Sequence, residues 1–242
     1  MPPSPDADRS AYDAARDGIR RWLNRARDRV MAPWRRFRAQ PAPQEIAATA
    51  PEWQQEVDRI LAALTPALRE GWAAADLPGN YRADDPYIRT NLALTRNLLV
   101  RIPDEVHALV VRQILEGVNN QETTEQIANR VDDVLTFTGS ANWSDRAKVI
   151  ARTEVNRHFN SSMLAHALLL EYQGRQDLSK QWDTRMDGKE RLWHHEANGQ
   201  TQLLTQPFLV GGETLLFPTD PRGRASNVVN CRCDLRILGG IS

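Results

Sequence analysis

The feature that most constrains the fold is a change in the hydrophobic pattern at Gly174. Before this glycine, apolar residues recur three and four positions apart through several long segments, which is the spacing of one face of an α-helix. After it the helical spacing fades, Gly, Pro, Asn and Thr become frequent, and short apolar runs typical of strands appear. The pattern predicts an α+β protein with a mainly helical N-terminal region and a small C-terminal domain of short antiparallel strands.

Prolines and polar stretches divide the helical region into separate helices. Pro66 is expected to kink or split the second helix, and Thr123 stands three residues before Gln126, the spacing of a capping box. Residues 1–8, with three prolines, are expected to be disordered, and residues 38–45 to form a linker. Helices are predicted at about 10–30, 51–76, 87–101, 103–118, 122–136 and 144–173.

The last of these helices, 144–173, is expected to connect to the small C-terminal domain and to buttress it. Within that domain Gly211-Gly212 lies between two apolar runs, which predicts a hairpin. Strands are predicted at 180–184, 208–210, 214–217 and 233–238. The predicted domain ranges are 1–45 for a basic N-terminal arm and linker, 46–140 for a helical region, and 141–242 for the long helix with the small α+β domain.

Composition excludes some classes of protein. Lys and Arg together number 31, as do Asp and Glu, so the overall charge identifies no partner. No apolar run approaches the ~20 residues that span a bilayer, and the polar N-terminus lacks the apolar core of a secretory signal. Two cysteines are too few for a disulfide framework. We therefore expect a soluble protein made without an export signal, in a reducing compartment.

Charge is uneven along the chain, because residues 20–38 hold eight arginines and one acid, Asp28. Such a segment can bind DNA phosphates while its aromatic residues stack on bases, or it can dock on an acidic protein surface. It can also be the solvated side of an amphipathic helix, and the sequence leaves these alternatives open. The candidate contact residues are Arg20, Arg21, Trp22, Arg25, Arg27, Arg29, Trp34, Arg35, Arg36, Phe37 and Arg38.

Polar residues also recur on the long 144–173 helix. Glu154 and Arg157 are three residues apart and can be neighbours on one face, and Asn156 and Asn160, four apart, share a face as well. Asparagine is a poor helix former because its side chain competes for backbone hydrogen bonds. The asparagine pair therefore indicates either a polar ridge that contacts the loops that follow or a solvated face.

A third polar group lies at Asp187, Arg191 and His194, which are spaced by four and three residues. If this stretch is helical, the three side chains share one face, where they can form a salt-bridge network. Alternatively, Asp187 and Arg191 can orient His194 for metal binding or for proton transfer. Proton transfer by this group would be consistent with a nuclease- or transferase-like enzyme.

Cys231 and Cys233 are the only two cysteines, and their close spacing allows three interpretations. A disulfide across one residue would be a strained ring. Zinc could take both sulfurs with His194 and His195 as a Cys2His2 set, although the usual spacing in such sites is C-x2-C. In a strand, the two side chains would point to the same face and enter the core as small apolar residues.

Four blocks occur in a distinctive order in the C-terminal half. They are AKVIARTEVNRHFN at 147–160, KQWDTRMDGKERLWHHEANGQ at 180–200, FLVGGETLLFPTDP at 208–221 and NVVNCRC at 227–233. Over roughly residues 120–238 the chain resembles the minor head protein family of tailed bacteriophages, typified by protein F of phage Mu and gene product 7 of phage SPP1. Asn156 stands where a small residue is typical. The matching residues are Arg152, Thr153, Glu154, Trp182, Asp187, Arg191, His194, Gly199, Gln200, Pro218, Asp220, Asn230, Cys231, Arg232 and Cys233.

The resemblance implies a minor capsid protein of the virion, in the head interior or at the portal vertex, and in the host cytoplasm during assembly. It implies a structural role in capsid assembly and head morphogenesis, with the portal and other head proteins as partners. Roles in genome packaging or DNA ejection, and contact with packaged DNA, are further expectations. The family pattern implies no catalytic activity and no cofactor, while a structural zinc stays open from the cysteine spacing.

Overall fold

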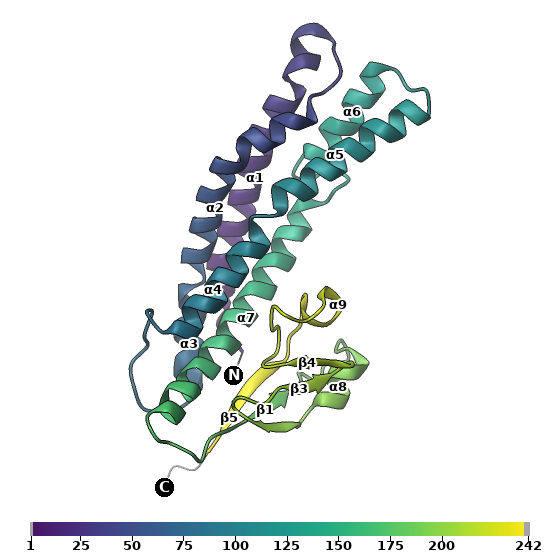
Figure 1. The fold of residues 1–242 in the computed structure, drawn as a ribbon. Helices are drawn as coiled ribbons and strands as arrows, with labels where there is room; N and C mark the ends of the chain where they lie inside the picture. Colours follow the sequence, from purple (N-terminus) through teal and green to yellow (C-terminus); the bar gives the residue numbers. More distant parts are fainter. Residues whose placement is uncertain (1, 240–242) are drawn as a thin grey trace. The chain divides into compact units, whose positions relative to one another are not determined.

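The computed structural model of the protein describes residues 2–239 and confirms the α+β class (Figure 1). The helices are α1 (Pro5–Phe37), α2 (Ala50–Ala63), α3 (Thr65–Ala74), α4 (Pro86–Leu99), α5 (Ile102–Asn119), α6 (Thr124–Leu135), α7 (Trp143–Tyr172), α8 (Leu192–Ala197) and α9 (Ala225–Val228), with a 3-10 helix η1 (Pro43–Thr49). The strands are β1 (Ser179–Asp183), β2 (Thr201–Leu203), β3 (Phe208–Val210), β4 (Glu213–Leu215) and β5 (Asp234–Leu238).

The start of α1 corrects the expectation that residues 1–8 are disordered. The helix begins at Pro5, because the hydroxyl of Ser4 accepts a hydrogen bond from the amide of Ala7 and so caps the first turn. Ser4 also donates to the carboxylate of Glu70 from its amide at 2.7 Å and from its hydroxyl at 2.6 Å. The predicted linker is shorter than expected as well, since Pro43 begins η1.

Two local signals in the sequence act as predicted. Leu64 separates α2 from α3, and Pro66 lies in the first turn of α3, where a missing amide hydrogen costs nothing. The capping box of α6 is also confirmed, because the Thr123 hydroxyl accepts from the Gln126 amide while the Gln126 side chain accepts from the Thr123 amide.

The strands form two small antiparallel sheets. One has the order β2-β1-β5, and the other is the predicted hairpin β3-β4, in which Gly211 and Gly212 take φ values of +57° and +77°. The sequence missed β2, whose three residues show no buried alternation. The predicted strand 233–238 begins one residue late, at Asp234, so the cysteines lie in a loop and not on one face of a strand.

Contacts divide the chain into two compact units, each assembled from separate segments of the sequence. The mixed unit comprises Met1–Ala11, Ala63–Thr95 and Val149–Ser242, and the helical unit comprises Tyr12–Ala62 and Arg96–Lys148. The predicted ranges 1–45, 46–140 and 141–242 are continuous, whereas the boundaries of these units fall inside helices α1, α2, α4 and α7. No helix in residues 2–239 is long and apolar enough to cross a membrane.

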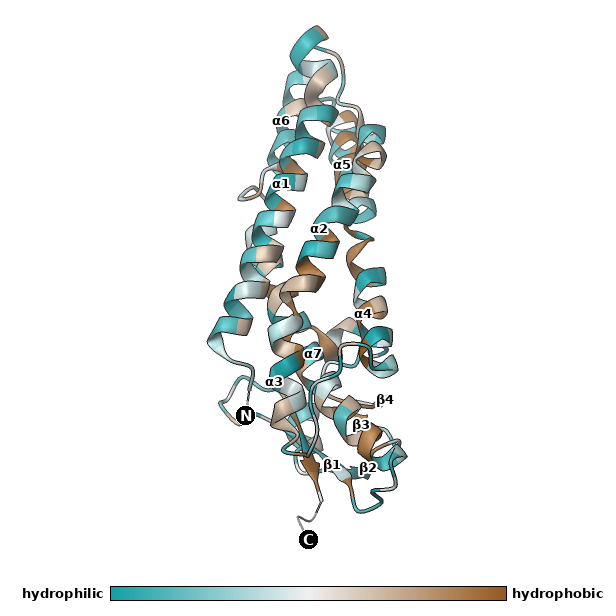
Figure 2. Cartoon of the chain, turned by 90° about the vertical axis from the view of Figure 1, so that its left-hand side faces the viewer, coloured by the Kyte–Doolittle hydropathy of each residue, from teal (hydrophilic) through white to brown (hydrophobic). Residues whose placement is uncertain are grey.

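The helical unit is built around three buried tryptophans whose indole nitrogens have hydrogen-bond partners. Ile19, Trp22, Leu23, Ala26 and Val30 of α1 are fully buried, as their spacing predicts, and Figure 2 shows hydrophilic and hydrophobic residues on different sides of this helix. The Trp22 ring lies 5.3 Å from that of Trp53. Buried indoles need acceptors, and these are Thr49 for Trp22, Leu99 for Trp53 and Val134 for Trp143.

The mixed unit packs α3 closely against the C-terminal half of α7. Gly71 permits this approach, because a Cβ at this position would lie 2.1 Å from the carbonyl oxygen of Phe159. The hydroxyl of Ser162 donates to the carbonyl of Leu68 at 2.6 Å, and His166 stacks on Trp72. The other side of α7 packs on a core that the small sheets supply, with Trp182, Phe208, Phe217 and Leu235 among its buried residues.

Candidate functional site

Helix α7 holds the cysteine loop through its two asparagines. The Asn156 amide donates to the carbonyls of Cys231 at 3.1 Å and Cys233 at 3.0 Å. Asn160 donates to the Cys233 carbonyl at 3.2 Å and accepts from the Leu235 amide at 2.7 Å. The interpretation of these asparagines as a ridge that contacts later loops is therefore confirmed, and their burial excludes a solvated face.

One turn earlier, α7 fixes the residue that precedes the cysteines. Asn230 takes a left-handed backbone with φ +57°, and its amide donates to the Thr153 hydroxyl at 2.9 Å. Arg152 donates to the Asn230 side chain at 3.1 Å. Residues from the Arg-Thr-Glu block and from the Asn-Cys-Arg-Cys block thus meet in space.

The remaining residue of that block, Glu154, forms a buried ion pair with Arg157 at 2.6 Å, as their spacing predicts. Arg157 also donates to the carbonyl of Thr219 at 3.0 Å, which attaches the loop after β4 to α7. Asp220 closes that loop by accepting from the amides of Leu216 and Arg222. Arg157 and Asp220 therefore bind backbone groups of the loop after β4.

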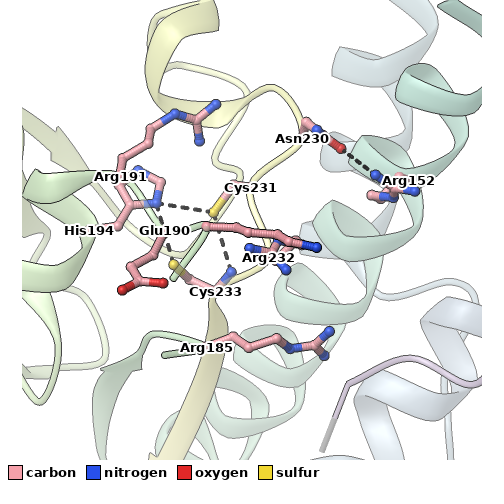
Figure 3. Close-up of a pocket in the computed structure, with 10 residues that line it drawn as sticks. Arg152, Arg185, Glu190, Arg191, His194, Asn230, Cys231, Arg232 and Cys233 are labelled. Carbon is pink, nitrogen blue, oxygen red and sulfur yellow. Dashed lines mark hydrogen bonds between the residues drawn. The ribbon is translucent and has the colours of Figure 1, made fainter. Parts of the chain in front are cut away.

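His194 lies on α8 with its ring orientation determined by one neighbour. Asn227 donates from its amide nitrogen to the Val210 carbonyl and to the Glu213 carboxylate, each at 2.9 Å, so its oxygen is left to accept. That oxygen lies 2.7 Å from Nε2 of His194, which must carry the proton. The unprotonated Nδ1 then points at the sulfurs of Cys231, 3.5 Å away, and Cys233, 3.4 Å away (Figure 3).

The two thiols influence each other's ionisation. The hydrogen bond between the cysteines lowers the pKa of Cys233 to about 5. The same hydrogen bond, together with burial, raises the pKa of Cys231 well above its ordinary value. Cys233 is therefore the more acidic thiol of the pair, and both cysteines are free of disulfides.

Asp187, Arg191 and His194 do not form the shared helical face that their spacing suggests. Helix α8 begins only at Leu192, so Asp187 and Arg191 lie in the preceding loop. Asp187 pairs with Arg232, whose hydrogen bond lowers the pKa of this carboxyl group, while Arg191 donates to the carbonyls of Asn227 and Val229.

Of the four predicted metal ligands, three lie together and one lies apart. His194, Cys231 and Cys233 come together, with ligand atoms within 4.8 Å of one another, whereas His195 is exposed and lies outside this group.

Trp182 packs edge-on against the His194 ring, with the ring centroids 5.5 Å apart. Asn227 and Thr184, whose hydroxyl donates to the His194 carbonyl, were missed by sequence reasoning because no spacing rule links them to His194.

A pocket of about 490 Å³ opens beside the cysteines and His194. Its charged side chains are mostly cationic, and the one carboxylate, Glu190, accepts from the amide of Asp187. An anion is the ligand that such a lining favours. The cationic residues are Arg152, Arg185, Lys189, Arg191 and Arg232.

The arginine-rich segment 20–38 lies in the helical unit, and most of its arginines have acidic partners there. Trp22 is buried in the core, so its ring is not presented to solvent. The Arg38 guanidinium lies over the Trp34 ring at 4.9 Å, while Phe37 is 78% exposed. Contact of this segment with DNA or with a portal stays a prediction. The ion pairs are Arg20–Asp17, Arg21–Glu56, Arg25–Glu56, Arg27–Asp132, Arg29–Glu52 and Arg35–Asp28.

Fold and site together define a class: an α+β protein whose polar motif residues bind its own C-terminal loops around a buried Cys–Cys–His group. A family model described as Phage Mu protein F like protein matches residues 104–236, which is more than half of the chain and contains this site. The chain belongs to this family and is a phage head morphogenesis protein. No curated protein and no solved structure matches the chain.

Proposed function

We propose that this protein is a minor capsid component that associates with the portal and acts in head assembly, and that genome packaging or DNA ejection depends on it. The observation that supports the proposal is the match to the Mu F-like family over residues 104–236, the range that contains the motif residues of the mixed unit. The proposed location is the portal vertex or the interior of the head.

Association with the portal is the decisive property. We expect the full chain, co-expressed with the portal protein encoded by the same phage genome, to copurify with it and to be present in assembled heads. Heads assembled without the chain are expected to be malformed or to fail in genome passage. A chain that bound neither the portal nor any other head protein would contradict the proposal.

The end of α1 is the proposed contact surface, because Arg36, Phe37 and Arg38 are exposed there. If the partner is a protein, Phe37→Ser should weaken copurification, whereas Leu115→Ser, at a residue of α5 that is also exposed, should not. If the partner is packaged DNA, Arg36→Ala with Arg38→Ala should weaken binding, and binding by the unmodified chain should fall steeply with salt.

An enzymatic role is the second candidate, and the site geometry favours it less. Asp187 is engaged by Arg232, Arg191 by backbone carbonyls, and His194 by Asn227 and the sulfurs. These contacts describe three separate structural roles and not one catalytic group. We therefore propose that the chain acts without turnover. DNA cleavage or group transfer by the purified chain that His194→Ala abolished would overturn this proposal.

A further inference from the structure

Three side chains with metal-binding donors converge inside the mixed unit. His194, Cys231 and Cys233, here termed the ligand cluster, are 2%, 1% and 3% exposed. Their Nδ1 and Sγ atoms all lie within 4.8 Å of one another. Imidazole nitrogen and thiolate sulfur are the donors that Zn²⁺ takes in proteins.

The two nitrogen–sulfur distances within the ligand cluster fit a shared ion. In a tetrahedral zinc site, bonds of ~2.3 Å to sulfur and ~2.0 Å to nitrogen place the two ligand atoms ~3.5 Å apart. Nδ1 of His194 lies 3.5 Å from Cys231 Sγ and 3.4 Å from Cys233 Sγ. Nδ1 has one lone pair and can accept one hydrogen bond, so thiol donation accounts for only one of these two contacts. One cation between the three atoms accounts for both.

The surroundings of the cluster have the form that supports metal ligands. Nε2 of His194 donates to the Asn227 oxygen at 2.7 Å, which keeps Nδ1 unprotonated and aimed at the sulfurs. The amide of Cys233 donates to Cys231 Sγ at 3.4 Å, a contact that stabilises sulfur as an anion. The Asn156 bonds to both cysteine carbonyls fix the loop, so the two sulfurs are held before any ion binds.

We propose that His194, Cys231 and Cys233 bind one Zn²⁺ through Nδ1 and two thiolates, and that the fourth position opens into the adjacent cationic pocket. Two thiolates balance the charge of the ion, so the nearby arginines do not oppose its binding. The three ligand residues themselves line the pocket of about 490 Å³. Its five cationic side chains favour water or an anionic oxygen, from a phosphate or a carboxylate, as the fourth ligand.

Metal content of the full chain tests the first half of this proposal. Protein purified under reducing conditions, without a metal-affinity step, is expected to contain about one zinc per chain by elemental analysis. His194→Ala and Cys231→Ser should lose most of that zinc, whereas His195→Ala, at the exposed neighbouring histidine, should keep it.

Because the ligand variants can lose zinc by misfolding, the unmodified chain supplies a second measurement. Cobalt(II) added to the reduced, metal-free protein should give the intense visible bands of tetrahedral cobalt and a sulfur-to-cobalt charge-transfer band. Addition of zinc should abolish both. Purified protein with no stoichiometric metal and no such bands on cobalt addition would overturn the proposal.

The cobalt-loaded protein also tests the open position. Inorganic phosphate and acetate, added in separate titrations, are expected to shift the visible bands until the site is saturated. The anion that shifts the bands at the lower concentration is the preferred ligand. Arg185→Ala with Lys189→Ala should weaken that response at unchanged cobalt content. Bands that neither anion changes would show a closed site and would refute the open fourth position.

Discussion

At the scale of the residue, Glu56 is a buried carboxylate with three arginine partners among residues 2–239. This side chain is 1% exposed and pairs with Arg21 at 2.7 Å, Arg25 at 3.1 Å and Arg59 at 2.9 Å. Burial alone would raise the pKa of Glu56, but the arginine hydrogen bonds outweigh it and lower the pKa from 4.5 to about 2. Part of the arginine-rich face of α1 is thereby explained as an internal contact.

Glu56→Gln is expected to lower the free energy of unfolding by about 2 kcal/mol at pH 7, since charged hydrogen bonds are lost. A carboxyl group with a lowered pKa stabilises the fold fully above its unfolded pKa of 4.5, and this stabilisation is lost as pH falls toward about 2. The difference in free energy of unfolding between the unmodified chain and Glu56→Gln, measured with urea, should therefore become smaller as pH falls over that range. Glu52→Gln, which removes the ion pair with Arg29, is the control and should change the free energy of unfolding little. If the difference in free energy of unfolding between the unmodified chain and Glu56→Gln stayed the same at low pH, Glu56 would not have a lowered pKa.

Lys180 is the opposite case, a fully buried lysine on β1 whose ammonium donates to the Leu216 carbonyl at 2.8 Å. Burial lowers the pKa of Lys180 from 10.5 to about 7, although Asp220 acts in the other direction. Between those values the unfolded chain binds the proton and the folded chain does not, so stability rises with pH by up to ~1.4 kcal/mol per pH unit.

Lys180→Met should remove this rise. The stability of the unmodified chain relative to the variant, from urea unfolding at a series of pH values above 7, is expected to increase with pH. Lys148→Met, at an exposed lysine, should show no such trend. If the free energies of unfolding of the unmodified chain and of Lys180→Met changed equally with pH, Lys180 would not titrate with a lowered pKa.

At the scale of the element, the contact of α3 with α7 depends on the absence of one side chain. Gly71→Ala places a Cβ 2.1 Å from the Phe159 carbonyl, which requires the helix backbones to separate. We expect a loss of about 1–3 kcal/mol in the free energy of unfolding, measured by urea or heat. At Gly18, in α1, the nearest atom to such a Cβ is 3.4 Å away, so Gly18→Ala should be neutral or stabilising. Equal changes in the free energy of unfolding for Gly71→Ala and Gly18→Ala would argue against the close approach of α3 to α7.

Local patterns predicted most elements, and the reasons for the failures are physical. Pro66, the Thr123 capping box and the glycine hairpin are signals contained within a few residues, and each acts as expected. Residues 5–8 are helical because Ser4 caps the first turn, and Ser4 is itself held by Glu70, a contact across 66 positions that no local pattern reports. The ligand cluster was predicted in part, since spacing identified the cysteines and His194 but could not exclude His195 or identify Asn227.

At the scale of the whole molecule, the predicted range 141–242 is continuous, whereas the mixed unit also contains residues 63–95. That segment supplies α3, which covers α7 through the Leu68–Ser162 hydrogen bond and the stacking of Trp72 on His166. Hydrophobic periodicity shows that α7 has buried faces, but it does not show which segment covers each face. The family match from residue 104 likewise excludes α3.

A fragment of residues 141–242 should therefore not reproduce the native fold. Without α3, the groups of α7 at Phe159, Ser162 and His166 lose their partners and become exposed. We expect non-cooperative unfolding of this fragment by circular dichroism and weak amide protection in α7, whereas in the full chain α3 and the C-terminal half of α7 should exchange together. A fragment that unfolded cooperatively, with full-chain protection in α7, would mean that residues 63–95 are dispensable for this unit.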